Sequence, residues 1–171
     1  MPKLCDYVIQ QLANHARMIQ GLVGGVAAEQ ACWKPSPDTW SVLEVIHHLY
    51  DEERDDFRRR LDHVLSHPGQ PWPGIDPRAW VVERRYNEQD FEQTVAGFLR
   101  ERDQSLRWLE GLVSPNWQIS YEAPWGSITA GDLLASWVAH DLLHMRQLVE
   151  LHWAYTTHQL EPDRVEYAGQ W

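Results

Sequence analysis

The chain has 171 residues, of which 43% are hydrophobic, and this length and composition suit a globular protein with a substantial core. Its formal net charge of −10 argues against nucleic acid and anionic membrane as partners. The polar N-terminus does not resemble a signal peptide, there is no apolar run of about 20 residues, and Cys5 and Cys32 form no disulfide framework. We therefore expect one soluble, cytoplasmic domain over residues 1–171.

Two long helices are predicted in the first third of the chain. Apolar residues at intervals of three and four predict the first helix over residues 6–26, and two prolines mark residues 29–38 as a loop. Thr39 or Ser41 can cap a second helix that runs to about Leu65, and Glu44, three residues after Ser41, has the spacing of a capping box. Glu53 lies near the centre of the apolar arc of this helix. It pairs with a cation or a metal, has a raised pKa, or extends its carboxylate to solvent.

A long connection and a third helix follow. Residues 67–78 contain four prolines and two glycines, which exclude a helix or a central strand. A connection of roughly 20 residues can cross the length of a bundle, so the second and third helices can run parallel. The third helix is predicted over residues 87–112 with Asn87 as its cap. A solvated face is predicted at Arg100, Glu101, Arg102 and Asp103. The alternation in residues 117–121 predicts a short strand or hairpin arm.

The fourth helix, over residues 130–155, carries the most informative pattern. At about 100° per residue its apolar stripe contains four residues, Leu133, Trp137, Leu148 and Leu151. His140 and His144 fall on the same stripe, four residues apart, so their rings leave the helix side by side. Imidazoles on a core-facing stripe need partners; a shared divalent metal would satisfy both, and hydrogen bonds within the core are the alternative. In the tail after Thr156, Tyr167 and Trp171 are expected to dock onto the bundle.

Together these elements predict an all-α four-helix bundle with a long crossover between helices two and three, a fold that places metal sites between facing helices. The second helix offers both His47 and His48, and periodicity does not decide between them. The carboxylates that could orient an imidazole are Glu44, Asp51, Glu52 and Asp141, although for each one singly an ordinary surface carboxylate is the favoured interpretation. Glu53 is a weak candidate for a general base. The histidines expected on the surface or in loops are His15, His63, His67, His152 and His158.

Two groups of residues resemble the motifs of the DinB-like (DinB/YfiT-like) family of four-helix-bundle metalloproteins. The first group comprises Trp40-Ser41, Glu44, and His48-Leu49 with Asp51 and Glu53; the second comprises His140, His144 and Gln147-Leu148. The metal triad of the family matches His48, His140 and His144. Arg146 stands where family members often have glycine, which changes the helix surface beyond the site.

The resemblance implies a divalent ion, zinc or nickel most often, held by three histidines with a position left open for water or substrate. Some family members resemble thiol S-transferases or isomerases that use a low-molecular-weight thiol, which implies a metal-dependent transferase acting on a small molecule. It also implies a homodimer, with which the ten tryptophans are compatible. The alternatives are a non-catalytic metal-binding or stress-related bundle, and a bundle that binds no metal.

Overall fold

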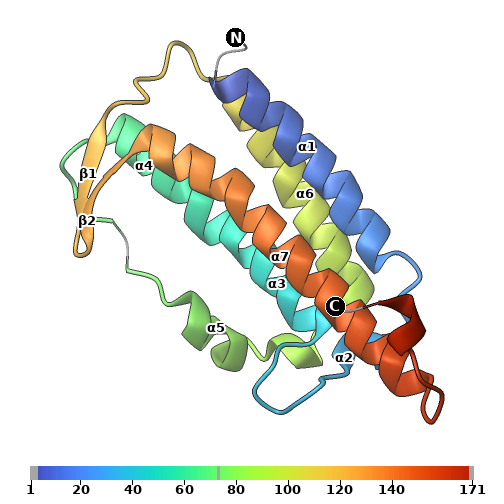
Figure 1. The fold of residues 1–171 in the computed structure, drawn as a ribbon. Helices are drawn as coiled ribbons and strands as arrows, with labels where there is room; N and C mark the ends of the chain where they lie inside the picture. The colour runs from blue at the N-terminus through green and yellow to red at the C-terminus, as the bar shows by residue number, and fades with distance from the viewer. Residues whose placement is uncertain (1–3, 73, 170–171) are drawn as a thin grey trace.

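Figure 1 shows a computed structural model of the protein, which describes residues 4–72 and 74–169. Four long helical segments pack side by side, which confirms the predicted all-α four-helix bundle. They are α1 (Leu4–Val23); a continuous second segment made of α3 (Val42–Asp51), the π-helical turn η1 (Glu52–Phe57) and α4 (Arg58–Ser66); α6 (Phe91–Glu110); and α7 (Ala130–Gln159). The shorter elements are α2 (Ala28–Cys32), α5 (Pro77–Glu83), η2 (Tyr86–Glu88), β1 (Ser120–Ala123), β2 (Gly126–Thr129) and η3 (Glu166–Ala168).

The second helical segment and α6 run parallel, as the long crossover allows (Figure 1). Successive contacts between these two helices involve residues later in both of them, as expected for a parallel pair. Tyr50 covers Gly97, where an added Cβ would meet the ring at 3.0 Å, and two turns later Arg58 donates to the hydroxyl of Ser105 at 3.2 Å. Both α1 and α7 run in the opposite direction (Figure 1). The second segment therefore lies between a parallel neighbour, α6, and an antiparallel neighbour, α7.

The crossover is more ordered than the sequence suggested. Asp76 accepts hydrogen bonds from the backbone N–H groups of Arg78 and Ala79 and starts the short helix α5, with Pro77 in its first turn. The predicted start of the third helix at Asn87 is wrong, because Asp90 caps α6 instead and accepts from the backbone of Gln93 at 2.8 Å. Asn87 lies in η2, where its side-chain oxygen accepts from the Ser41 hydroxyl at 2.6 Å.

A two-stranded antiparallel hairpin joins α6 to α7, with Tyr121 paired to Ile128. It is the hairpin arm that the alternation predicted, displaced towards α7. The Tyr121 ring stacks on Trp72 from the crossover at 4.1 Å. In the tail, the prediction that Tyr167 docks is wrong, because its side chain is fully exposed; Trp171 lies outside the described residues.

The predicted capping box at the start of α3 is present. Ser41 Oγ accepts from the backbone of Glu44 at 3.1 Å, and Glu44 accepts in return from the backbone of Ser41 at 2.9 Å. Glu44 also pairs with Lys34 at 2.7 Å. Its carboxylate therefore fixes the start of α3 and does not orient any of the histidines, which removes Glu44 from the candidate partners of His48, His140 and His144.

The apolar core is divided into two clusters by a layer of charged side chains. One cluster comprises Ile19, Val23, Val42, Val45, Ile46, Leu49, Phe98, Met145, Leu148 and Leu151. The other comprises Val8, Leu12, Leu61, Val64, Leu109, Ala130, Leu133, Leu134 and Trp137. On each long helix, one residue lies between these clusters: His15 on α1, Glu53 on η1, Arg102 on α6 and Asp141 on α7, all buried.

Arg102 connects this layer. Its Nε donates to Glu53 at 2.9 Å, its two terminal nitrogens donate to Asp141 at 2.7 and 2.9 Å, and one of them also donates to the backbone carbonyl of Leu12 at 3.1 Å. Asp141 is in turn 3.2 Å from His15. The predictions that Arg102 lies on a solvated face and that His15 lies on the surface are therefore wrong. For Glu53, pairing with a cation is the alternative that the structure supports.

We predict that Arg102→Ala lowers the free energy of unfolding by about 3–5 kcal/mol, because it leaves two buried carboxylates without their cation. Equilibrium unfolding in urea measures this loss. Arg100→Ala, an exposed arginine one half-turn away on the same helix, should change stability by less than about 0.5 kcal/mol. Equal losses in the two variants would contradict the importance of the buried layer.

Candidate metal centre

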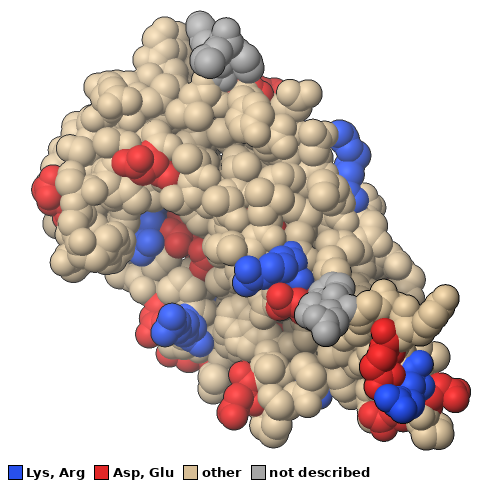
Figure 2. Space-filling model, in the orientation of Figure 1, with Lys and Arg blue, Asp and Glu red and all other residues tan. Residues whose placement is uncertain are grey.

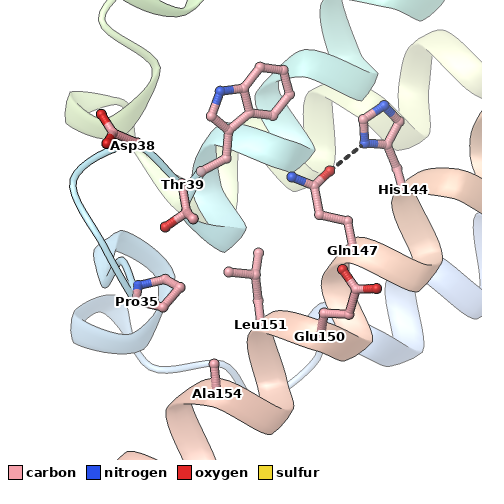
Figure 3. Close-up of a pocket in the computed structure, with 9 residues that line it drawn as sticks. Pro35, Asp38, Thr39, His144, Gln147, Glu150, Leu151 and Ala154 are labelled. Carbon is pink, nitrogen blue, oxygen red and sulfur yellow. Dashed lines mark hydrogen bonds between the residues drawn. The ribbon is translucent and has the colours of Figure 1, made fainter. Parts of the chain in front are cut away.

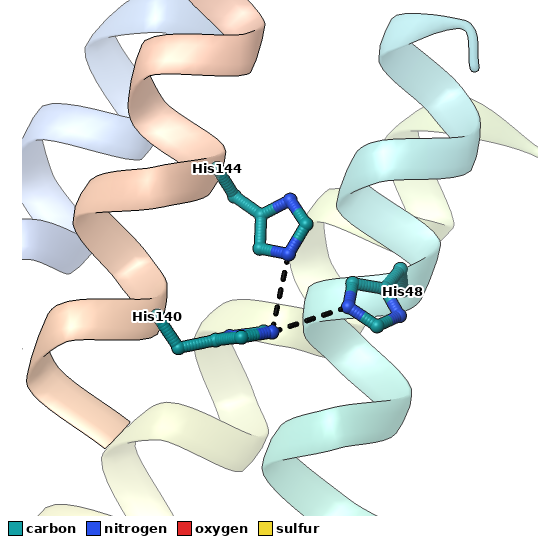
Figure 4. Close-up of side chains that lie close together, drawn as sticks. All are labelled: His48, His140 and His144. Carbon is teal, nitrogen blue, oxygen red and sulfur yellow. Dashed lines mark hydrogen bonds between the residues drawn. The ribbon is translucent and has the colours of Figure 1, made fainter. Parts of the chain in front are cut away.

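Three imidazole rings meet between α3 and α7 (Figure 4). His48 comes from α3, and His140 and His144 come from successive turns of α7. The Nε2 atom of His140 is 3.3 Å from that of His48 and 3.1 Å from that of His144. One ligand nitrogen from each ring lies within 4.8 Å of the other two, so the three histidines form a group that could hold a metal ion.

The chemistry of the ring atoms fits a bound cation better than hydrogen bonds alone. A neutral imidazole carries at Nε2 either one proton or one lone pair, both in the plane of the ring. The Nε2 of His140 therefore cannot satisfy both of its neighbours at once. A divalent cation would accept a lone pair from all three rings, which is the donor set of many zinc sites.

Burial keeps these rings neutral. Desolvation, followed by the neighbouring His144 and His140, lowers the pKa of His48 to about 2. Desolvation and then His144 lower the pKa of His140 to about 3, and desolvation also lowers the pKa of His144. The three imidazoles are therefore unprotonated near neutral pH, as metal ligands must be.

The second nitrogen of two of these rings faces an identifiable oxygen. His144 Nδ1 is 2.8 Å from Gln147 Oε1, one turn further along α7. His48 Nδ1 is buried without a hydrogen-bond partner, and its nearest carboxylate oxygen, Glu52 Oε1 at 3.8 Å, is likewise buried and unpartnered. Coordination through Nε2 would place a proton on Nδ1, and Glu52 Oε1 is the oxygen towards which that proton would be directed.

The structure distinguishes His47 from His48, between which the periodicity of the sequence did not decide. His47 points to the other side of α3, stacks on Tyr86 at 4.2 Å and lies 3.6 Å from Asp51. Asp51 also accepts from the Tyr86 hydroxyl at 2.7 Å and pairs with Arg84 at 2.6 Å. This group ties the crossover to α3, so Asp51 anchors the crossover and makes no hydrogen bond to the triad.

The remaining candidates divide between the triad and the charged layer. Glu52 is close to the triad, whereas Asp141, the residue after His140, is bonded to Arg102 and His15. Both oxygens of Glu53 are engaged, one by Arg102 and the other by the indole N–H of Trp137 at 3.0 Å. This geometry gives no support to Glu53 as a general base.

The other histidines lie away from the triad, as expected. His152 is nevertheless half-buried, and its ring lies 2.6 Å from the Leu22 carbonyl oxygen.

Aromatic side chains wall the triad. Trp40, just before α3, lies parallel to the His144 ring with 6.3 Å between centroids and tilted to His48 at 5.0 Å. Phe57, at the end of η1, is 5.1 Å from His140. The sequence placed Trp40 and Gln147 in the motifs that resemble the family but gave them no role at the site, and it did not single out Phe57. For Gln147, the position one turn after His144 on the same stripe was the available signal.

A pocket of about 640 Å³ opens beside His144 (Figure 3). Its lining residues are Pro35, Asp38, Thr39, Trp40, His144, Gln147, Glu150, Leu151 and Ala154. One triad member therefore lies in the wall of a pocket that is large enough for a small molecule.

A four-helix bundle with a histidine cluster between two of its helices defines a class of candidate metalloproteins. The chain belongs to the DinB superfamily, whose family model matches residues 11–148. Among solved structures it is similar to YfiT from Bacillus subtilis, with a TM-score of 0.75, 21% identity, and coverage of 86% of this chain and 85% of that one. YfiT is described as "a probable metal-dependent hydrolase with an unusual four-helix bundle topology". No protein with a curated description matches the chain. Within residues 4–72 and 74–169, no helix is both long and apolar enough to span a membrane.

We predict that the metal-free protein is most stable near neutral pH. The folded-state pKa values of His48 and His140 lie below the ordinary value of 6.5, so the unfolded state binds more protons and stability falls as pH falls below about 6.5. Glu52 has the opposite effect, because burial and Asp56 raise its pKa from 4.5 to about 9, and the stability it contributes is lost as pH rises towards that value.

Urea unfolding in the presence of a chelator at about pH 5, 7 and 9 measures this dependence. His48→Gln should flatten the decline between about pH 7 and 5, since one of the depressed groups is gone. An unchanged slope in that variant would show that His48 is not held neutral by burial.

Proposed function

We propose that this protein is a divalent-metal-dependent enzyme that transfers a low-molecular-weight thiol to a small electrophile, with zinc or nickel held by His48, His140 and His144. The observation that carries the proposal is the convergence of three imidazoles, one of which, His144, lines a pocket of about 640 Å³. Three protein ligands leave a coordination position open, which distinguishes catalytic from structural zinc sites. In the reaction the thiol sulfur forms a bond to carbon, the leaving group departs with its electron pair, and the thiol proton neutralises it.

Different residues of the site would have different roles in this reaction. A bound divalent cation supplies a positive charge that lowers the pKa of a thiol or a water beside it. Gln147 orients the ring of His144, while Trp40 and Leu151 offer apolar surface to the substrate in the pocket. Phe57 and Trp40 limit the access of water to the rings that they flank.

Hydrolysis is the second candidate, because the same site would activate water in place of a thiol. The description of YfiT as a metal-dependent hydrolase favours it. A third outcome, a metal-binding bundle without activity, predicts that chelation lowers the melting temperature while neither thiol conjugation nor hydrolysis is detected.

We predict that purified protein contains close to one equivalent of divalent metal, and that His144→Ala removes it because two imidazoles bind far more weakly than three. Elemental analysis measures the metal content. His47→Ala is the matched control, since it changes a histidine next to His48 that faces Tyr86, and it should keep the metal. Equal metal content in the wild type and His144→Ala would remove the site.

A screen of thiols against small electrophiles then tests the reaction. Conjugation by the metal-loaded wild type, lost with a chelator and in His144→Ala but kept in His47→Ala, is expected. If the loaded wild type accelerates hydrolysis but not conjugation, the second candidate replaces the first.

We also propose a cytoplasmic homodimer that forms through the exposed surface of α1 and α7. Met18, Leu142 and Leu143 are each about half exposed there, and Figure 2 shows few charged side chains over the upper part of this face. Exposed apolar patches of this kind commonly mark protein contacts. The two free cysteines suit a reducing compartment.

Leu142→Glu should shift the protein from dimer to monomer, because it places a charge in the proposed contact. Size-exclusion chromatography with light scattering reads out the mass. Leu160→Glu makes the same change at an exposed leucine beyond the end of α7 and should leave the dimer intact. A wild-type monomer, or a dimer in both variants, would contradict this surface.

A further inference from the structure

The side-chain amide of Gln147 lies between the triad and the pocket. Its oxygen is 2.8 Å from His144 Nδ1, and in Figure 3 its nitrogen points away from that ring, towards the side of the pocket where Thr39 lies. Gln147 is itself one of the residues that line the pocket. The two ends of one amide therefore face two different environments.

The orientation of this amide follows from the chemistry of His144. A ring that offers the lone pair of Nε2 to a cation carries its proton on Nδ1 and must donate there. Only the oxygen of the Gln147 amide can accept that proton. The amide nitrogen, with two N–H groups, is then directed to the pocket, and no hydrogen bond from it to another described residue is found.

The rest of the lining describes what the N–H groups would meet. Apolar surface comes from Pro35, Leu151 and Ala154, and an aromatic face comes from Trp40. The nine lining residues include two carboxylates, Asp38 and Glu150, and no lysine or arginine. This composition disfavours a ligand with a negatively charged body. It suits an uncharged or cationic molecule with an apolar part and an oxygen that accepts a hydrogen bond.

We propose that Gln147 is a specificity-determining residue that fixes His144 for coordination through its oxygen and binds a carbonyl oxygen of the substrate through its nitrogen. The substrate class is an uncharged or cationic carbonyl compound with an apolar body. This inference rests on the proposed function, because it assigns the substrate of the same site.

Three variants separate the two roles of the amide. Gln147→Glu keeps an oxygen for His144 Nδ1–H but removes the donor, whereas Gln147→Leu removes both. Gln10→Glu makes the same charge change at an exposed position on α1 and is the matched control. Zinc affinity, measured by calorimetric competition with a chelator, should be no weaker in Gln147→Glu than in the wild type. It should fall about 10- to 100-fold in Gln147→Leu.

The second readout is binding of benzamide to the zinc-loaded proteins, since this uncharged probe combines a phenyl group with a carbonyl oxygen. We expect the wild type and Gln10→Glu to bind it equally, and Gln147→Glu to bind it about tenfold more weakly while still holding zinc. A para-carboxylate on the probe should weaken its binding to the wild type further, because the added charge meets the carboxylates of the pocket.

Each result decides a separate point. Equal probe affinity in the wild type and Gln147→Glu would overturn the contact with substrate, and unchanged zinc affinity in Gln147→Leu would overturn the role in fixing His144. A wild-type protein that binds zinc but not the probe would overturn the substrate class. Failure of the wild type and Gln10→Glu to bind either zinc or nickel would instead refute the proposed metal-dependent function itself.

Discussion

The buried guanidinium of Arg102 is the interaction on which the geometry of this bundle depends. It joins α6 to the carboxylate of Glu53 in η1, to that of Asp141 in α7 and to the backbone of α1. Apolar side chains on either side can pack in many ways, but a bidentate pair with a carboxylate has one good geometry. A buried pair adds little net stability compared with apolar residues of the same size, so its value here lies in fixing how the helices face one another.

That constraint reaches the histidines through short segments of rigid helix. His140 precedes Asp141 directly, and His48 stands five residues before Glu53, so both sides of the triad are attached to residues that Arg102 holds. The π-helical turn η1 begins between His48 and Glu53, and π-turns occur frequently at functional sites. The long crossover contributes as well. The crossover lets α3 and α6 run parallel. The second helical segment therefore meets Arg102 of α6 through Glu53 and meets the histidines of α7 through His48.

How far the sequence predicts this protein depends on whether a feature is local. The helices follow from amphipathic periodicity, and the pairing of His140 with His144 follows from their separation by one turn, so both were predictable. The choice of His48 over His47 came from family resemblance, because each lies off the centre of the apolar arc. Arg102 was mistaken for a solvated residue because its sequence neighbours are charged, and its partners are 49 and 39 residues away. A pairing at that distance leaves no periodic signal.

The charged layer also affects the electrostatic potential at the triad. Asp141 raises the pKa of His140 and Arg102 lowers it, so the layer acts on the triad with charges of both signs, and these charges lie in the interior, where water screens charges poorly. The three imidazoles beside it are neutral, because burial lowers their pKa values below the physiological range. A divalent cation between them would therefore meet three uncharged donors, whose positions are fixed by the helices that Arg102 holds together.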